Sequence, residues 1–215
     1  MSRCFIFGAA PVLRVAVMPN KDDYIIAADG GLDTLNSLGL AADLILGDFD
    51  SLSFTPQGDN VITHPVEKDC TDMQLALEQG YSEGFREFYI YGGVGGDRLD
   101  HFVANLQLLS LFADKGADCF LFGEGYVITC LCNGECAFSD KAEGTVSVFC
   151  ACDKAEGVTI KNLKYTLQDS TLSNLTPLGV SNSFIGKEGK ISVKKGILML
   201  VFDEKNLEHF NFYKA

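Results

Sequence analysis

The sequence predicts an N-terminal Rossmann-like α/β domain with a mostly parallel sheet, followed by a C-terminal antiparallel β-sandwich. Two observations support this fold class. Strand-like apolar runs alternate with helical patterns as far as residue 122, which is typical of a parallel sheet with helices on both faces. From Tyr126 onward, only short strand-like runs remain, separated by Gly, Asn, Asp or Lys, as in an antiparallel sandwich. The pattern changes between residues 124 and 134, and we place the two domains at 1–128 and 129–215.

Apolar runs and helical spacing define the elements of the first domain. Strands are expected at 4–7, 24–28, 44–46, 61–63, 88–91 and 119–122. A helix from Leu32 to Leu38 should end near Gly39, and a second should open at Thr71, with Thr71 or Asp69 as its cap, and run to about Glu78. Apolar residues at 99, 102, 103, 106, 109 and 112 have a helical period and predict a third helix.

The second domain shows strand signals only. Examples are the runs at 145–150, 158–160, 190–193 and 197–202. We detect no low-complexity linker and no internal repeat.

Composition excludes several classes of protein. The chain has 215 residues, of which 47% are apolar, but no stretch approaches the roughly 18 apolar residues of a membrane span. The apolar N-terminus is interrupted at Pro11 and Arg14 and is interpreted as a first strand rather than a signal peptide. A net charge of −12 argues against nucleic acid or an anionic membrane as partner.

Eight cysteines without a secretory signal indicate reduced thiols and a cytoplasmic protein. The group Cys130, Cys132, Cys136, Cys150 and Cys152 suggests zinc at first sight. However, Cys-x-Cys pairs lack the spacing of common structural zinc sites. Both pairs lie in strand-like runs, so we expect each to occupy one sheet face as small apolar residues.

The most informative motif is Gly47-Asp48-Phe49-Asp50-Ser51, which directly follows an apolar run. Ligands of open α/β sheets bind at the carboxyl ends of the strands. If the chain stays extended there, Asp48 and Asp50 point the same way, and a Mg²⁺ ion between carboxylates and substrate phosphates would relieve their repulsion. An acidic, solvated turn is the alternative interpretation. Phe49 is expected to turn inward.

Other predicted strand ends carry glycine or aspartate as well. These are Asp29-Gly30-Gly31 and the run from Gly92 to Gly96, and Lys68-Asp69-Cys70-Thr71-Asp72 lies at a helix start. Helix N-termini and glycine-rich backbone suit phosphate. Carboxylates beside such phosphate-binding backbone are consistent with an anion that carries Mg²⁺.

The glycine run continues into Asp97-Arg98-Leu99-Asp100-His101. Arg98 can contact phosphate in a bidentate manner. The glycines could instead form a flexible loop, Asp97 and Asp100 could serve only the helix N-terminus, and His101 could be structural. P-loop and nucleophile-elbow motifs are absent from the sequence. These patterns indicate Mg²⁺-dependent phosphoryl or pyrophosphoryl transfer.

In this order, these four motifs closely resemble the thiamine pyrophosphokinase family. The later segments Leu163-Lys164-Tyr165 and Gly179-Val180-Ser181-Asn182-Ser183-Phe184 also look like its C-terminal domain. The resemblance covers nearly the whole chain. It departs from the family at Asp97, which separates Gly96 from Arg98, and in the absence of Trp, so that an aromatic contact to thiamine must come from Tyr or Phe.

The resemblance implies transfer of the pyrophosphoryl group of ATP to the hydroxyl of thiamine, giving thiamine diphosphate and AMP. It implies Mg²⁺ as cofactor, ATP and thiamine as ligands, and a homodimer with its site at the subunit interface. The first domain would be the nucleotide-binding catalytic domain, and the second would bind thiamine and dimerise. A pyrophosphokinase acting on a pterin alcohol and a non-catalytic thiamine or nucleotide sensor are the alternatives.

The resemblance also implies roles for residues of this chain. The metal ligands would be Asp48, Asp50 and Asp72, and the catalytic set adds Arg98 and Asp100. The catalytic base would be Asp100 or Asp72. ATP would be bound by Asp29, Gly30, Gly31, Ser51, Lys68, Asp69, Thr71, Gly92, Gly93, Gly95, Gly96, Arg98 and His101. Thiamine would be bound by Tyr165, Ser181 and Asn182.

Overall fold

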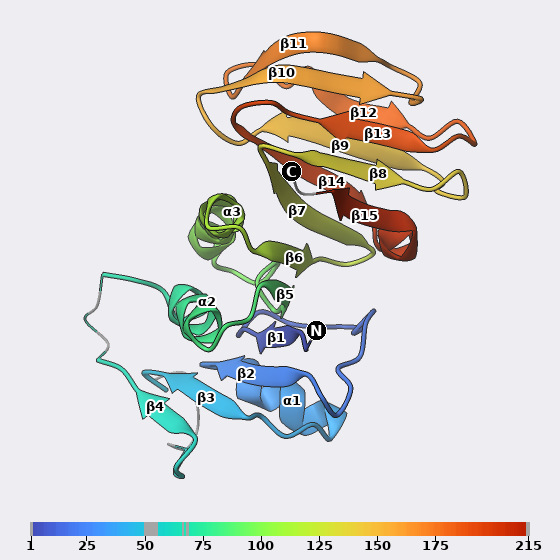
Figure 1. Cartoon of the computed structure of the whole chain (residues 1–215). Helices are drawn as coiled ribbons and strands as arrows, with labels where there is room; N and C mark the ends of the chain where they lie inside the picture. Colours follow the sequence, from blue (N-terminus) through green and yellow to red (C-terminus); the bar gives the residue numbers. More distant parts are fainter. Residues whose placement is uncertain (1, 50–55, 66, 68, 214–215) are drawn as a thin grey trace. The chain divides into compact units, whose positions relative to one another are not determined.

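A computed structural model describes residues 2–49, 56–65, 67 and 69–213 (Figure 1). The chain divides into two compact units. The N-terminal unit comprises residues 1–108 and 117–124, and the C-terminal unit comprises residues 109–116 and 125–215. No helix in the described parts of the chain is long and apolar enough to cross a membrane.

In the described residues of the N-terminal unit, six strands lie in the order β6-β5-β1-β2-β3-β4, and every neighbouring pair is parallel (Figure 1). Their bounds are β1 Cys4–Phe7, β2 Tyr24–Ala28, β3 Leu44–Gly47, β4 Val61–Thr63, β5 Glu87–Tyr91 and β6 Asp118–Phe122. Strands β1, β2, β5 and β6 are almost wholly buried, which is why they read as continuous apolar runs. The predicted parallel sheet is confirmed.

The α-helices of the described part of the chain are α1 Gly31–Leu38, α2 Asp72–Ser82 and α3 Leu99–Asp114. Helix α1 ends at Gly39 in the left-handed conformation, and the Thr71 hydroxyl caps α2 by accepting a hydrogen bond from the Gln74 amide, both as predicted. Helix α2 runs past the predicted end near Glu78. It continues through Gly80, where a Cβ would lie 2.8 Å from the Phe88 ring, so this glycine permits close packing on the sheet instead of ending the helix.

The sheet of the N-terminal unit has two different faces. Cys4 and Phe88 face α2 at Gly80. The other face carries stacked rings, including Phe5 on Tyr89 with centroids 5.0 Å apart and Tyr91 on Phe122 at 4.4 Å. Such aromatic contacts add to the free energy gained from burial, so this face is a rigid support for the strand ends.

The C-terminal unit is built from antiparallel strands in two sheets, with strand orders β12-β9-β14-β7 and β11-β10-β13-β8-β15 (Figure 1). The bounds are β7 Tyr126–Cys132, β8 Glu135–Phe138, β9 Thr145–Cys150, β10 Lys154–Lys161, β11 Leu167–Ser173, β12 Gly179–Ser183, β13 Gly189–Ser192, β14 Ile197–Asp203 and β15 Phe210–Tyr213, with a 3₁₀ helix η1 Glu204–His209. Phe138 of one sheet meets Phe202 of the other edge to face, with centroids 5.0 Å apart. The chain therefore combines a parallel α/β sheet with antiparallel sheets.

The cysteines follow the sequence expectation only in part. Cys130 and Cys132 lie in β7 and both face α3, where Cys130 Sγ lies 3.6 Å from Ser110 Oγ and Cys132 Sγ lies 3.8 Å from Asp114 Oδ1. For the second pair the expectation was wrong, because β9 ends at Cys150 and Cys152 lies in the bend that follows. The chain must turn there to reach β10 in the other sheet.

Candidate functional site

The carboxyl ends of the parallel strands bring the sequence-predicted segments to one edge of the N-terminal unit. Phe7 is in register with Ala27 and Tyr91, and Ala28 is in register with Leu46. The residues that follow these strands, including Gly8, Asp29 and Gly92, therefore lie along one edge. This is the edge at which open α/β sheets bind their ligands.

Glycines on this edge allow close backbone approach. A Cβ on Gly31 would lie on the carbonyl oxygen of Phe7, and a Cβ on Gly8 would lie 2.7 Å from the oxygen of Gly92 and 2.8 Å from Met73 Cε. Gly31 is the first residue of α1, and Met73 lies in the first turn of α2. The N-termini of both helices therefore meet the strand ends at the same place. Their free backbone N–H groups suit phosphate.

Two aspartates follow the neighbouring strands β2 and β3. The Asp29 amide donates a 2.8 Å hydrogen bond to the Leu46 carbonyl, and a Cβ on Gly47 would lie 3.1 Å from Asp29 Cα. Both Asp29 and Asp48 are half-buried. Gly47 thus permits the close contact that brings the two acidic strand ends together.

The chain does not stay extended at Phe49, which was the condition for Asp48 and Asp50 to point the same way, and Asp50 itself lies outside the described residues. Phe49 has a φ of 60°, which is the left-handed region and is rare for a bulky residue. Its side chain is 4% exposed, so the expected inward packing is confirmed. The buried ring and the left-handed backbone therefore occur together at Phe49.

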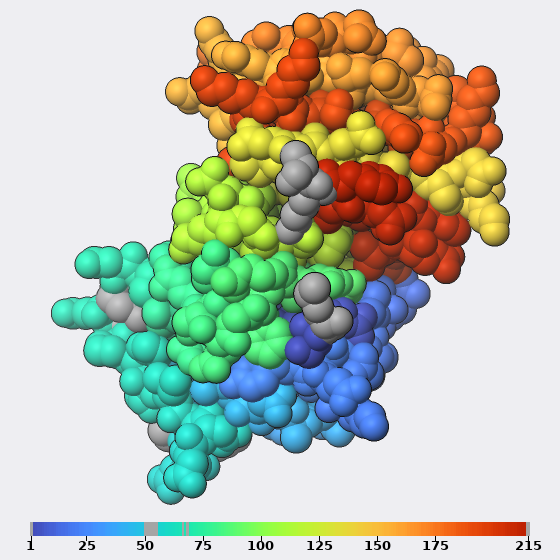
Figure 2. All heavy atoms as spheres, in the orientation of Figure 1, coloured from blue at the N-terminus to red at the C-terminus, as the bar shows by residue number. Residues whose placement is uncertain are grey.

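The structure describes most of the acidic segment 68–72 at the start of α2. Thr71 and Asp72 are half-buried and open α2, while Asp69 is exposed. Asp50, Ser51 and Lys68 lie outside the described residues. The described residues 56–65 between β3 and α2 lie mostly at the surface, where Figure 2 shows them in turquoise.

The glycine loop after β5 is anchored at its start and open at its end. Gly92 and Gly93 are buried, and the Asn105 side-chain amide donates a 2.8 Å hydrogen bond to the Gly93 carbonyl oxygen. Gly95 and Gly96 are exposed with φ values of 87° and 71°, a conformation that glycine adopts without strain. The loop thus presents free backbone next to the strand ends.

Arg98 and Asp100 form a bidentate ion pair at the start of α3. The distances are 3.0 Å from Nε to Oδ1 and 2.8 Å from the second guanidinium nitrogen to Oδ2. The hydrogen bonds from Arg98 lower the pKa of Asp100 to about 2. Both side chains are about two-thirds exposed, and His101 is exposed as well. The guanidinium is therefore accessible to an anionic ligand.

The aspartates of this edge offer the donor chemistry of a hard divalent cation. Among the described residues, no group of three or more His, Cys, Asp or Glu is assembled closely enough to hold a metal ion. Mg²⁺ commonly uses only one or two protein carboxylates together with substrate phosphates, so Asp48 and Asp72 fit such an ion. Phosphoryl transfer from ATP requires this kind of charge neutralisation.

Two of the three predicted thiamine residues line one cavity of the C-terminal unit. This cavity of about 190 Å³ is lined by Ile160, Tyr165, Thr166, Leu167, Leu178, Gly179, Val180 and Asn182. Asn182 is 3% exposed, and its amide accepts from the Tyr165 amide and donates to the Tyr165 carbonyl at 2.9 and 2.6 Å. Asn182 therefore holds Tyr165 at the cavity, while Tyr165 is 59% exposed.

Ser181 is exposed beside this cavity but does not line it. It has a φ of 58°, and its amide donates a 3.0 Å hydrogen bond to Ser147 Oγ. Strand β9 therefore supports the irregular part of β12 that carries Ser181.

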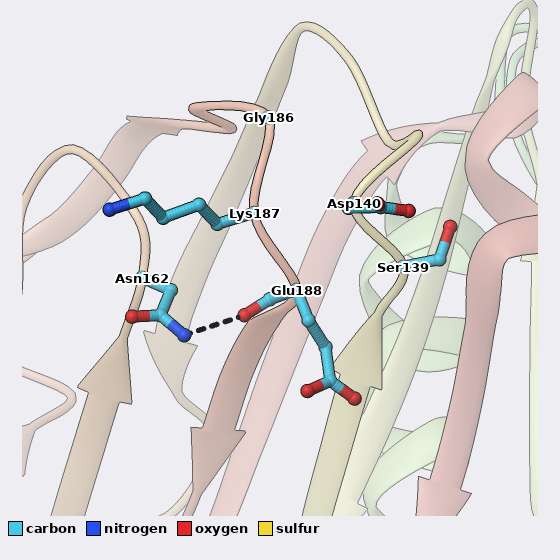
Figure 3. Close-up of a pocket in the computed structure, with 6 residues that line it drawn as sticks. All are labelled: Ser139, Asp140, Asn162, Gly186, Lys187 and Glu188. Atoms are coloured by element: carbon cyan, nitrogen blue, oxygen red, sulfur yellow. Dashed lines mark hydrogen bonds between the residues drawn. The ribbon is translucent and has the colours of Figure 1, made fainter.

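A more open cavity of about 550 Å³ contains no predicted site residue. It is lined by Ser139, Asp140, Asn162, Gly186, Lys187 and Glu188. Figure 3 shows that the Lys187 and Asp140 side chains point away from each other, and that Asn162 donates to the Glu188 backbone oxygen at 2.9 Å. These side chains do not converge on a common point, so the cavity has no built ligand site.

Sequence reasoning missed the residues that support this site. Asn105 lies within the apolar pattern of α3, and a polar residue on a buried helix face was the available signal. Tyr91 was read only as strand, yet its hydroxyl accepts a 3.0 Å hydrogen bond from the Val17 amide. Contacts between segments so far apart in the sequence have no local signal.

Comparisons with known proteins agree with this arrangement. Residues 16–121 match the model for the thiamin pyrophosphokinase catalytic domain, and residues 136–198 match the model for the thiamin pyrophosphokinase vitamin B1 binding domain. A curated thiamine pyrophosphokinase of Bacillus subtilis is 28% identical over 183 residues, covering 82% of this chain and 85% of that protein.

Two crystal structures of thiamin pyrophosphokinases have the fold described above. The thiamine pyrophosphokinase of Bacillus subtilis gives a TM-score of 0.80 at 26% identity and covers 94% of this chain and 99% of its own. The thiamin pyrophosphokinase of Geobacillus thermodenitrificans gives 0.76 at 28% identity and covers 95% and 100%. Both domain models, a curated relative and the fold agree, and the chain therefore belongs to the thiamin pyrophosphokinase family of enzymes.

Proposed function

We propose that this enzyme transfers the pyrophosphoryl group of ATP to the hydroxyl oxygen of thiamine, giving thiamine diphosphate and AMP. The observation that carries the proposal is the carboxyl edge of β1, β2, β3 and β5. There, two helix N-termini and close-packed glycines adjoin the acidic strand ends, in a chain whose two halves match the two domains of this family.

The phosphates of ATP would be held mainly by backbone. The N-terminus of α1 at Gly30 and Gly31 and the loop from Gly92 to Gly96 supply N–H groups, and Arg98 supplies a guanidinium. Thr71 and His101, with Ser51 and Lys68 outside the described residues, complete the proposed ATP contacts. In-line attack on the β-phosphorus then depends chiefly on positioning and charge neutralisation.

Mg²⁺ is the proposed cofactor, with Asp48, Asp50 and Asp72 as its protein ligands. When bound, the ion would neutralise charge on the phosphate oxygens. Asp29, Asp69 and Asp100 would complete the acidic shell. We assign acceptance of the thiamine hydroxyl proton to Asp72 rather than Asp100, because a carboxylate whose pKa is lowered to about 2 is a weak base.

Thiamine is proposed to bind at Tyr165, Ser181 and Asn182. The supporting observations are the mainly apolar cavity and the two hydrogen bonds by which Asn182 holds the Tyr165 backbone. A cationic thiazolium also suits a chain with a net charge of −12.

We further propose a Rossmann-like catalytic domain at 1–128 and a β-sandwich domain at 129–215, supported by the parallel strand order and by the Phe138–Phe202 contact between the antiparallel sheets. A cytoplasmic homodimer with its site at the subunit interface completes the proposal. Light scattering of the purified chain across a concentration series tests the dimer.

The reaction is tested with purified protein, ATP, Mg²⁺ and thiamine, following nucleotides and thiamine diphosphate by chromatography. AMP and thiamine diphosphate should appear in equal amounts. Formation of ADP would indicate transfer of a single phosphoryl group. Binding of thiamine without turnover would indicate a sensor, and preference for a pterin alcohol in competition would indicate the related pyrophosphokinase.

A further inference from the structure

Cys150 and Cys152 lie where the chain leaves one sheet of the C-terminal unit for the other. Cys150 is the last residue of β9, and β10 begins at Lys154. The residues between them form a bend. Neither cysteine has a role in the proposed reaction.

The two sulfurs are close and directed into the same bend. Their Sγ atoms are 3.9 Å apart. The Cys150 thiol donates to the Cys152 carbonyl oxygen at 3.0 Å, and the Ile197 amide donates to Cys152 Sγ at 3.3 Å. A disulfide needs a sulfur–sulfur distance of about 2.05 Å, so a shift of roughly 2 Å, within reach of side-chain rotation, would form the bond.

Several other cysteines of the chain are buried. Cys4, Cys130 and Cys136 are at most 3% exposed, and burial raises the pKa of Cys130 to about 12. Burial and the Asp114 carboxylate raise the pKa of Cys132. Buried thiols react slowly. Cys150 and Cys152 are both partly exposed, as are Cys70 and Cys132, and what sets Cys150 and Cys152 apart is the 3.9 Å distance between their sulfurs.

We propose that Cys150 and Cys152 are a modification site, a dithiol that closes to an intramolecular disulfide on reaction with a small-molecule disulfide such as oxidised glutathione. The proposal is independent of the transfer reaction and needs no metal. It assigns a redox function to the β9–β10 connection.

The chemistry proceeds in two exchanges. The Cys152 thiolate attacks one sulfur of the small disulfide, forms a mixed disulfide and expels one thiolate. The Cys150 thiolate then attacks Cys152 Sγ, forms the Cys150–Cys152 bond and expels the second thiolate. The two protons lost by the protein are taken up by the two expelled thiolates. The protein loses two electrons, and the small disulfide gains them.

Cys152 is assigned the first attack for a structural reason. Burial and the nearby Cys152 sulfur raise the pKa of Cys150. A raised pKa leaves less thiolate on Cys150 for a first attack, and the Ile197 amide holds Cys152 Sγ in place at 3.3 Å.

The experiment uses the full chain equilibrated with oxidised and reduced glutathione, acid-quenched, alkylated in denaturant and digested with trypsin. Cleavage after Lys141 and Lys154 yields one peptide, 142–154, whose only cysteines are Cys150 and Cys152. As the buffer becomes oxidising, we expect this peptide to appear without alkyl groups and with the mass of its dithiol form less two hydrogen atoms. Its oxidised fraction should depend on the square of the reduced glutathione concentration, because two thiols are released.

Single variants distinguish the steps. Cys150→Ser should accumulate a glutathione adduct on Cys152, whereas Cys132→Ser, the matched control in strand β7 of the same sheet, should leave disulfide formation in peptide 142–154 unchanged. The proposal is overturned if this peptide keeps both thiols alkylated in buffers that oxidise other cysteines. It is also overturned if Cys152 pairs with a cysteine outside the peptide.

Discussion

The side-chain amide of Asn105 in α3 donates a 2.8 Å hydrogen bond to the backbone carbonyl oxygen of Gly93. Asn105 is 7% exposed, and a Cβ added to Gly93 would lie 3.1 Å from the Nδ2 atom of Asn105. The first part of the glycine loop proposed to bind phosphate is therefore fixed by a helix side chain. The loop's free end, at Gly95 and Gly96, remains exposed.

Replacing Asn105 with Asp should weaken ATP binding. The substitution keeps the size of the side chain but replaces the N–H donor with a carboxylate oxygen that repels the Gly93 carbonyl. Leaving a buried polar group without its partner costs about 1–3 kcal/mol, which urea unfolding would measure. Steady-state kinetics should show a raised KM for ATP with little change in the KM for thiamine. Gln107→Glu, an equivalent change at an exposed position of the same helix, serves as control.

Replacing Asp48 with Asn should abolish most turnover while the fold is retained. Asp48 is a half-buried strand-end residue, and loss of its charge would misplace the metal and the triphosphate by enough to lower kcat on the order of 100-fold. Asp59→Asn makes the same change at an exposed turn of the same unit and should have little effect. Near-normal kcat for Asp48→Asn, with an unchanged Mg²⁺ dependence, would remove Asp48 from the metal site.

The Arg98–Asp100 ion pair leads to a prediction about how the stability of the fold depends on pH. Its guanidinium lowers the pKa of Asp100 to about 2, against about 3.9 in an unfolded chain. The ionised pair therefore favours the folded state at pH values above about 4, and this contribution is lost as the pH falls through about 2. Both groups are exposed, so the effect on stability is small. Arg98→Ala should return the pKa of Asp100 toward 3.9, as measured by NMR titration of the carboxyl group.

The same pair constrains the pH–rate profile. If kcat falls as the pH is lowered to about 4, the group being protonated cannot be Asp100 while Arg98 is paired with it. Asp100→Asn should therefore lower kcat without changing the pH at which this fall occurs. A fall that disappears in Asp100→Asn but persists in Asp72→Asn would identify Asp100 as the base.

The sequence predicted the parallel sheet and the strand-end positions because both depend on local signals. Apolar runs followed by Gly or Asp identify buried strands and their carboxyl ends, and Thr71 is a local capping signal. The left-handed turn at Phe49 and the bend at Cys152 depend on where distant side chains pack. The bonds from Asn105 to Gly93 and from Asn182 to Tyr165 join segments 12 and 17 residues apart, and pattern reading does not reveal such partners.

Asn182 supports the proposed thiamine site through backbone contacts. Its amide bonds to the Tyr165 amide and carbonyl and to the Ser183 amide at 2.9, 2.6 and 2.9 Å. Replacing Asn182 with Ala should therefore free the 163–166 turn and raise the KM for thiamine, with the KM for ATP nearly unchanged. The buried groups left without partners should also lower the free energy of unfolding by about 1–3 kcal/mol.

Asn174→Ala is the matched control, because Asn174 is exposed in the connection between β11 and β12. A general loss of stability would affect both substrates alike. A selective rise in the KM for thiamine at temperatures well below the unfolding transition of the Asn182→Ala variant would therefore show that the amide acts by holding Tyr165 in place. Equal changes in both KM values would assign Asn182 to the fold alone.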